Sequence, residues 1–117
     1  MAKSLARQIL DGARVLVGVR GTWTRHHLAL TANNRECDPT DPRAVRFCAY
    51  GALVRSAYDL TGDAREARKL AGRTAMSITN RNNPHEAFED IYTINDGPAV
   101  SSRNAIIGLF DRSLERV

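Results

Sequence analysis

Apolar residues recur at helical spacing along most of the chain, and this pattern predicts about five helices. The first is predicted over residues 3–17 and is followed by glycine-containing sequence. Two later helices begin at capping-box patterns, one at Asp63 and one at Asn83. The last is predicted to begin at Ser101 or Ser102 and to bury one apolar face. Helices of this kind are expected to pack on one another around a shared core.

The helix predicted over residues 41–60 differs from the others because it is apolar on two sides. Thr40 or Asp41 would cap its start, and Pro42 would occupy its first turn. One broad face would bury Val45, Cys48, Ala49, Ala52, Leu53 and Leu60, and a second stripe would bury Phe47, Gly51, Val54 and Tyr58. A helix that is apolar on two sides is buried on two sides. We therefore expect it at the centre of the fold.

Residues 22–38 lack the helical period and predict a β-hairpin instead. Residues 22–31 are rich in β-forming side chains, and Asn33-Asn34 can adopt the positive φ angles of a tight turn. Residues 35–38 would form the second strand, and prolines close the segment. The expected fold is mainly α, with about five helices around the central helix (41–60) and one small β-hairpin (about 22–38), in a single compact domain of 117 residues.

Composition agrees with an ordinary globular domain and narrows the class of protein. The chain is 43% hydrophobic and 26% charged, and no apolar run approaches the roughly 18 residues that a membrane span requires. Its two cysteines do not make a disulfide framework, so we expect reduced thiols and a cytoplasmic protein. The sequence predicts no cofactor and no metal site, because no cysteine or histidine shows zinc-ligand spacing and no phosphate-binding glycine loop occurs.

Charge is concentrated in the first part of the chain, where residues 1–35 hold six basic residues against one acidic residue. Arginine suits phosphate and carboxylate groups, although a GC-rich genome also favours it. Trp23, Arg25 and His27 would share one face of the predicted strand. Together with Arg20 and Arg35 they form a candidate binding surface for an anion, a nucleic-acid base or a protein. The structural alternative is that Trp23 anchors the hairpin to the helices.

Cys48 is the candidate nucleophile of the chain. Because it lies about two turns into the predicted central helix among small and apolar residues, a packing role is favoured. A cysteine hydrolase would need a base such as His85 and an orienting group such as Asn95, but ten residues separate these two on one helix, about 15 Å along its axis. Asn95 and Asp96 either stop that helix or line a pocket as a polar pair.

The sequence resembles a family of small proteins of unknown function found in bacteria and their phages. The resemblance rests on Trp23, on the pattern A-x-x-x-C-x-x-G-A-L (Ala44, Cys48, Gly51, Ala52 and Leu53), and on Asn95-Asp96 before a final amphipathic helix. Members often carry an aromatic residue before Asn-Asp, where this chain has Ile94. The resemblance implies a compact bacterial or phage domain in which these residues belong to one arrangement, and it implies no activity.

These observations favour a non-enzymatic binding or regulatory protein, and the resemblance suggests an accessory protein of a phage or mobile element that binds a host protein. The candidate binding residues are Arg20, Trp23, Arg25, His27, Arg35, Asn95 and Asp96. A protein is the expected partner, and a homo-oligomer is compatible with the sequence. Two alternatives stay open: a nucleic-acid or nucleotide binder that uses the Trp/Arg/His hairpin, and a hydrolase that uses Cys48.

Overall fold

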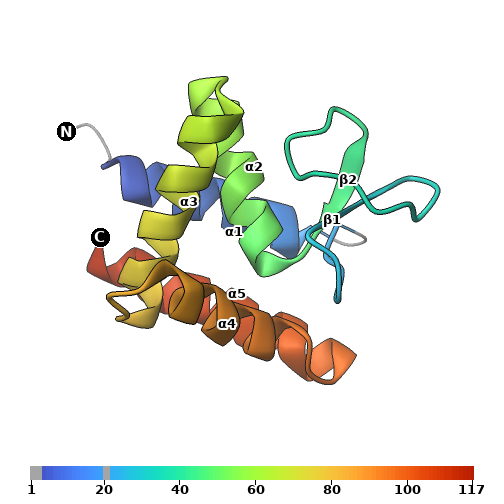
Figure 1. Cartoon of the computed structure of the whole chain (residues 1–117). Helices are drawn as coiled ribbons and strands as arrows, with labels where there is room; N and C mark the ends of the chain where they lie inside the picture. Colours follow the sequence, from blue (N-terminus) through green and yellow to red (C-terminus); the bar gives the residue numbers. More distant parts are fainter. Residues whose placement is uncertain (1–3, 20–21) are drawn as a thin grey trace.

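The computed structural model describes residues 4–19 and 22–117, and within them it contains five helices and one two-stranded sheet (Figure 1). In chain order the elements are α1 (Leu5–Gly18), β1 (Ala29–Thr31), β2 (Ala44–Phe47), α2 (Ala49–Thr61), α3 (Ala64–Thr79), α4 (Pro84–Asn95) and α5 (Ala99–Arg116). This confirms the expected class, which is mainly α with a small β element. Among the described residues, no helix combines the length and the apolar character that a membrane crossing requires.

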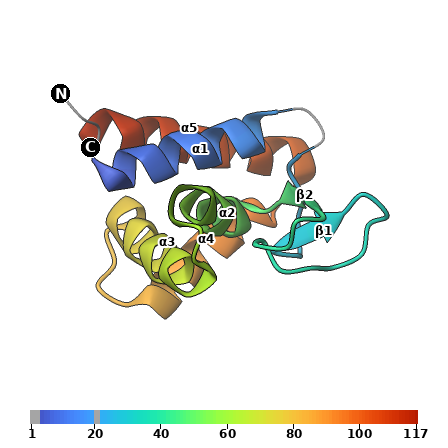
Figure 2. The same cartoon turned by 90° about the horizontal axis from the view of Figure 1, so that it is seen from above.

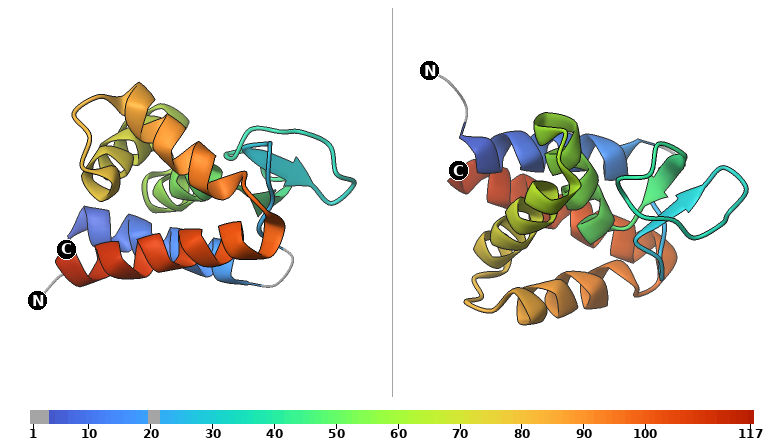
Figure 3. Two further views of the ribbon diagram at one scale, coloured as in Figure 1. Left: turned by 90° about the horizontal axis from the view of Figure 1, so that it is seen from below. Right: turned by 45° about the horizontal axis from the view of Figure 1, so that its top comes forward.

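The helices form two layers, with the sheet at one end (Figures 2 and 3). In one layer α1 and α5 run antiparallel and side by side, and α2, α3 and α4 make up the other layer. α2 packs against α1, α3, α4 and β2, so it is the central helix of the fold. Its buried residues include Ala52, Leu53 and Ala57, which are fully enclosed. The sheet lies beside the start of α2, and the chain that leads into β1 contacts the loop between α4 and α5.

The predicted capping patterns set the start of two helices. The Asp63 side chain accepts hydrogen bonds from the backbone N–H groups of Arg65 and Glu66, and Asn83 caps α4 in the same way. Pro84 fills the first position of α4, where its missing N–H costs nothing. The last helix begins earlier than expected, at Ala99 directly after Pro98, so that Ser101 and Ser102 lie inside its first turn.

The central helix begins eight residues later than predicted. Asp41 does not cap a helix: its carboxylate accepts from the Arg43 N–H within a turn, and the chain then continues as β2. The strand buries Ala44 and Phe47 and exposes Val45. A strand of four residues can bury its first and last residues, and one turn of a helix can bury the same two. The apolar pattern of such a short segment therefore does not distinguish a strand from a helix. Cys48 is therefore the N-cap of α2, not a residue two turns inside it.

The hairpin also differs from the prediction in its strand partner. β1 pairs antiparallel with β2, with Ala29 opposite Phe47, whereas the predicted 22–31/35–38 pair is reduced to an isolated bridge between Leu30 and Glu36. Asn34 adopts the expected positive φ, 62°. Residues 22–28 are mostly irregular. Part of this segment runs along the edge of β2 that does not face β1, where the Thr24 N–H donates a hydrogen bond to the Phe47 carbonyl.

Candidate functional site

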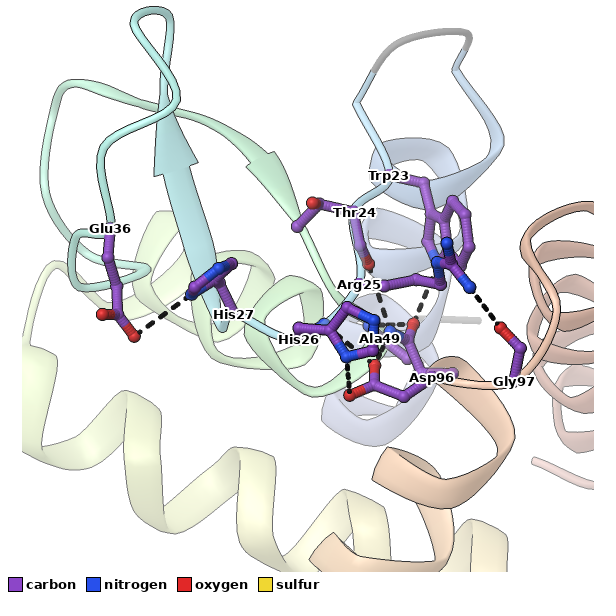
Figure 4. A network of polar contacts seen from close by, with 10 residues as sticks. Trp23, Thr24, Arg25, His26, His27, Glu36, Ala49, Asp96 and Gly97 are labelled. Atoms are coloured by element: carbon purple, nitrogen blue, oxygen red, sulfur yellow. Dashed lines mark hydrogen bonds and ion pairs between the residues drawn. The ribbon is translucent and has the colours of Figure 1, made fainter.

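Asn95, the last residue of α4, joins three segments that are distant in sequence. Its side chain is buried, with 1% of the residue exposed. Oδ1 accepts hydrogen bonds from Trp23 Nε1 at 2.8 Å and from the Ala49 N–H at 3.0 Å. Nδ2 donates to the Thr24 carbonyl at 3.1 Å and to Asp96 Oδ1 at 2.9 Å. One amide thereby fixes residues 23–24, the start of α2 and the end of α4 relative to one another (Figure 4).

Asp96 follows in the chain, and His26 encloses its carboxylate. The His26 N–H donates to Oδ1 at 3.0 Å, and His26 Nδ1 lies 3.2 Å from Oδ2 (Figure 4). His26 adopts a φ of 70°, a left-handed conformation that few residues other than glycine take. This conformation directs both its main chain and its ring at one carboxylate. The Asp96 side chain is 9% exposed, while the His26 side chain that covers it is 59% exposed.

The carboxylate is held in its charged form despite this burial. Burial by itself would raise the pKa of Asp96, but the hydrogen bonds from Asn95 and from the His26 main chain, together with the nearby Tyr92 hydroxyl, hold that pKa below its usual range. The same carboxylate raises the pKa of Tyr92, first because it accepts a hydrogen bond from the neutral hydroxyl and second because it would repel a phenolate. Asp96 therefore carries its negative charge at neutral pH.

A pocket of about 140 Å³ opens beside this carboxylate. It lies between the loop before β1, the start of α2 and one side of α4. Its apolar and aromatic lining consists of Leu28, Tyr50, Phe88, Ile91 and Tyr92, and its polar lining consists of His26, His27, Glu36, Cys48, Asn95 and Asp96. His27 Nδ1 lies 3.4 Å from Glu36 Oε1 at the opposite side of the opening (Figure 4). An apolar pocket with a few polar groups at its edge is typical of a binding site.

Cys48 lies on the wall of this pocket, and its thiol is occupied by the helix that it caps. Sγ accepts a hydrogen bond from the Gly51 N–H at 3.3 Å. Burial raises the pKa of the Cys48 thiol to about 11, and this effect outweighs the backbone hydrogen bonds that lower it. The neutral thiol is thus the stable form at physiological pH.

The profile of a family of unknown function, DUF6197, matches residues 1–116. The chain belongs to this family. The membership confirms the resemblance to an uncharacterised family that the sequence motifs indicated. No curated protein and no solved structure matches the chain.

In this DUF6197 member, the motif residues form one physical unit around the start of α2. Cys48 caps the helix, and Gly51 lets its first turn approach the Leu28 carbonyl oxygen, which a Cβ at residue 51 would overlap. Trp23 and Asn95 meet through the 2.8 Å hydrogen bond already described. The motif residues therefore lie together in this chain, and Cys48, Asn95 and Asp96 among them line the pocket.

The predicted Trp/Arg/His surface is not assembled on one face. Trp23 bonds to Asn95, and Arg25 Nη1 donates to the Gly97 carbonyl at 2.7 Å, so both side chains contact the junction of α4 and α5 (Figure 4). His27 turns away from them toward the pocket, and Arg35 lies in the exposed turn after β1. Arg20 lies outside the described residues. The segment that was expected to align these side chains as a strand is mostly irregular, since its backbone bonds to Phe47 and to the side chains of Asn95 and Asp96 instead.

The Cys48–His85–Asn95 set is not assembled either. His85 lies in the first turn of α4 with its Nε2 3.0 Å from Glu89, at the opposite end of the helix from Asn95. The structure places two histidines in the pocket with Cys48: His27, a predicted binding residue, and His26, which sequence reasoning missed. The aromatic residues Tyr50, Phe88 and Tyr92 were also missed. Their spacing indicates only helix faces, and nothing local shows that α2 and α4 meet there.

Proposed function

We propose that this protein is a non-enzymatic binding protein that recognises a partner protein by receiving one of its side chains in the pocket beside Asp96. The observation that carries the proposal is the pocket itself, in which an apolar and aromatic wall faces a charged carboxylate that is almost completely buried. In this proposal the protein acts in the cytoplasm, which fits its two free thiols. A phage or mobile-element origin is supported by the sequence resemblance alone.

The size of the pocket favours a side chain over a larger ligand. Pockets that hold drug-sized molecules or cofactors measure about 300–1,000 Å³. An engineered cavity of about 150 Å³ accommodates benzene, so a pocket of about 140 Å³ holds a group of similar size. A nucleotide would place most of its atoms outside. The pocket is large enough for the end of one amino-acid side chain, with the rest of the partner resting on the surrounding surface.

A cysteine hydrolase is the second candidate, because Cys48, His26 and Asp96 line the same pocket. The imidazole is oriented by a carboxylate, as a catalytic base requires. The thiol, however, is bonded to Gly51, and its pKa is raised to about 11, opposite to the shift that activates a nucleophile. These two facts favour binding over covalent chemistry.

Filling the pocket tests the binding proposal. Leu28 lines the pocket and is 39% exposed, so Leu28→Trp places an indole at the opening without disturbing the core. Val45→Trp is the matched control, since Val45 is 41% exposed on the neighbouring strand and lies outside the pocket. Each protein is purified by affinity from its native cells, and co-purifying proteins are quantified by mass spectrometry.

We expect one stoichiometric protein to be retained by the wild type and by Val45→Trp, and to fall at least tenfold with Leu28→Trp. Retention of that protein by Leu28→Trp, or the absence of any stoichiometric protein partner, would contradict the proposal. Thermal denaturation of both variants checks that each is folded.

A further inference from the structure

Three aromatic rings line one side of the pocket and contact one another. Tyr50 and Phe88 meet edge to face, with ring centroids 5.0 Å apart and planes at 79°. Phe88 and Tyr92 are stacked at 6.0 Å with an interplanar angle of 26°. These contacts hold the rings in place before any ligand arrives. The faces of aromatic rings carry negative electrostatic potential and attract cations.

The charge of the pocket is opposite to that of the whole chain. The chain has a formal net charge of +4, but the charged residues among those that line the pocket are Asp96 and Glu36. Within the described lining there is no lysine or arginine, and the basic groups that face the two carboxylates are the imidazoles of His26 and His27. An acidic, aromatic pocket in a basic protein selects a cationic group.

The carboxylate also has an oxygen available for such a group. Asp96 Oδ1 accepts from His26 N–H and Asn95 Nδ2, whereas Oδ2 is buried and has no hydrogen bond of normal geometry from the described residues. His26 Nδ1, 3.2 Å away, covers Oδ2 from a ring that is largely exposed. A buried carboxylate oxygen that accepts no hydrogen bond has an unfavourable free energy. A ligand group that donates a hydrogen bond to Oδ2, after the His26 ring has turned outward, would remove this penalty.

From these observations we infer that the pocket binds the ammonium group of a lysine side chain supplied by the partner protein; this inference rests on the proposed function. The four methylenes of lysine would lie along Leu28 and the three rings, and the ammonium would reach Asp96 Oδ2. Arginine fits less well, since its guanidinium binds best to both oxygens of a carboxylate, and Oδ1 already accepts from the His26 N–H and from Asn95 Nδ2.

The test compares three blocked amino acids as probes, titrated separately and followed by NMR shifts of the backbone amides that line the pocket. N-acetyl-lysine N-methylamide carries the ammonium, the norleucine analogue keeps the apolar stem without charge, and the arginine analogue carries a guanidinium. n-Butylammonium serves as a free amine. We expect the lysine probe to bind at least about tenfold more tightly than the norleucine probe, because a hydrogen bond to a charged group is lost in the latter.

Two variants assign the effect to the pocket. Asp96→Asn removes the charge, and we expect it to abolish the preference for lysine over norleucine. Tyr92→Leu removes one exposed aromatic ring together with its hydroxyl and leaves the hydrogen bonds of Asn95 in place, so it keeps the test decisive if Asp96→Asn does not fold. It should weaken lysine binding about threefold with little effect on norleucine. Tyr92→Phe, which removes the hydroxyl alone and keeps the ring, separates the two contributions. Glu89→Gln, on α4 outside the pocket, is the control and should change neither.

The outcomes separate this inference from the proposed function. Pocket shifts with the norleucine or arginine probe that equal or exceed those with lysine would overturn the lysine inference and leave a binding pocket. Tighter binding of n-butylammonium than of the blocked lysine would overturn a protein-borne lysine in favour of a free amine. If no probe shifts the pocket resonances at saturating concentration, the lysine inference fails. The proposed function is then decided separately, by whether Leu28→Trp loses the partner protein that the wild type and Val45→Trp retain.

Discussion

Cys48 follows β2 directly and caps α2, with its thiol turned into the first turn of the helix. A position at a helix N-terminus ordinarily favours the thiolate, whereas burial favours the neutral thiol. Here burial prevails: 8% of the residue is exposed, and its pKa is raised to about 11. At pH 7 about one thiol in ten thousand is then ionised. The raised pKa favours the unreactive thiol that the sequence predicts, and its cause, burial, is the expected one, although Cys48 lies at a different place on the helix.

The rate of alkylation by iodoacetamide at pH 7.5 measures the reactivity of the Cys48 thiol directly. Cys37 is partly buried and outside the pocket, and it serves as the internal control. We expect Cys37 to be labelled at least tenfold faster than Cys48 in the native protein, and both at similar rates in urea, as measured by peptide mass spectrometry. Labelling of native Cys48 as fast as Cys37 would favour the hydrolase over the binding protein.

At the scale of elements, the contact between the chain before β1 and the start of α2 decides the shape of the pocket. The Leu28 carbonyl accepts from the Cys48 N–H at 3.2 Å, and the backbone of Gly51 lies directly against the same carbonyl. Asn95 adds a hydrogen bond to the Ala49 N–H. The first turn of a helix has backbone N–H groups with no partner inside the helix. At the start of α2, the Leu28 carbonyl and the Asn95 side chain accept hydrogen bonds from two such groups.

Gly51→Ala tests this contact. The added methyl group would overlap the Leu28 carbonyl, which is main chain and cannot move without shifting the strand, so we expect a loss of about 1–3 kcal/mol in the free energy of unfolding. Gly72→Ala in α3 is the matched control, because its Cβ would meet only the Tyr50 hydroxyl at an ordinary 3.7 Å. Alanine favours a helix over glycine, so Gly72→Ala should be neutral or stabilising. If Gly51→Ala and Gly72→Ala change the free energy of unfolding in urea equally, the close approach of Gly51 to the Leu28 carbonyl is not what requires glycine at residue 51.

Across the whole molecule, arginine side chains connect elements that are distant in sequence. Arg7 donates to the Val117 carbonyl at the end of α5, and Arg103 donates to the carbonyls of Val17 and Gly18 at the end of α1. Arg25 and Arg55 bind loop carbonyls in the same way. Much of the arginine content therefore has an internal use, which removes part of the reason to expect an anionic partner.

Carboxylates take part in the same network and predict how stability depends on pH. Hydrogen bonds from arginines lower the pKa of Asp41 and of Asp90, and the pKa values of Asp38 and Asp96 are lowered although burial opposes this. An unfolded aspartate titrates near pH 3.9. As pH falls through the native values, the unfolded state binds more protons than the native state, so stability is lost.

We expect the free energy of unfolding, measured in urea, to be constant above about pH 5 and to fall steadily between about pH 4 and pH 2. Asp96→Asn removes one of these groups, so its stability should change less steeply over that range. A wild-type stability that is flat or rises as the pH falls would contradict the lowered pKa values.

The sequence by itself determined that the fold is mainly helical, and it determined where α3 and α4 begin, because those two starts depend on local chemistry. Asp63 and Asn83 supply side-chain acceptors to backbone donors two and three residues ahead, and any tertiary structure would leave that choice in place. The expected turn at Asn34 is local in the same sense. The apolar pattern also identified the central helix, since a helix that is buried on two sides needs an apolar surface on both.

Only the tertiary structure decided where that helix begins and what stands beside it. Residues 44–47 are a strand because β1 offers them partners, and this pairing joins segments separated by thirteen residues or more. His26 meets Asp96, and Tyr50 meets Phe88, across still larger separations. Contacts of this kind leave no periodic signal in the sequence, since the first depends on how the chain before β1 reaches the end of α4 and the second on the packing of α2 against α4. The pocket exists for that reason and could be found only after the helices were placed.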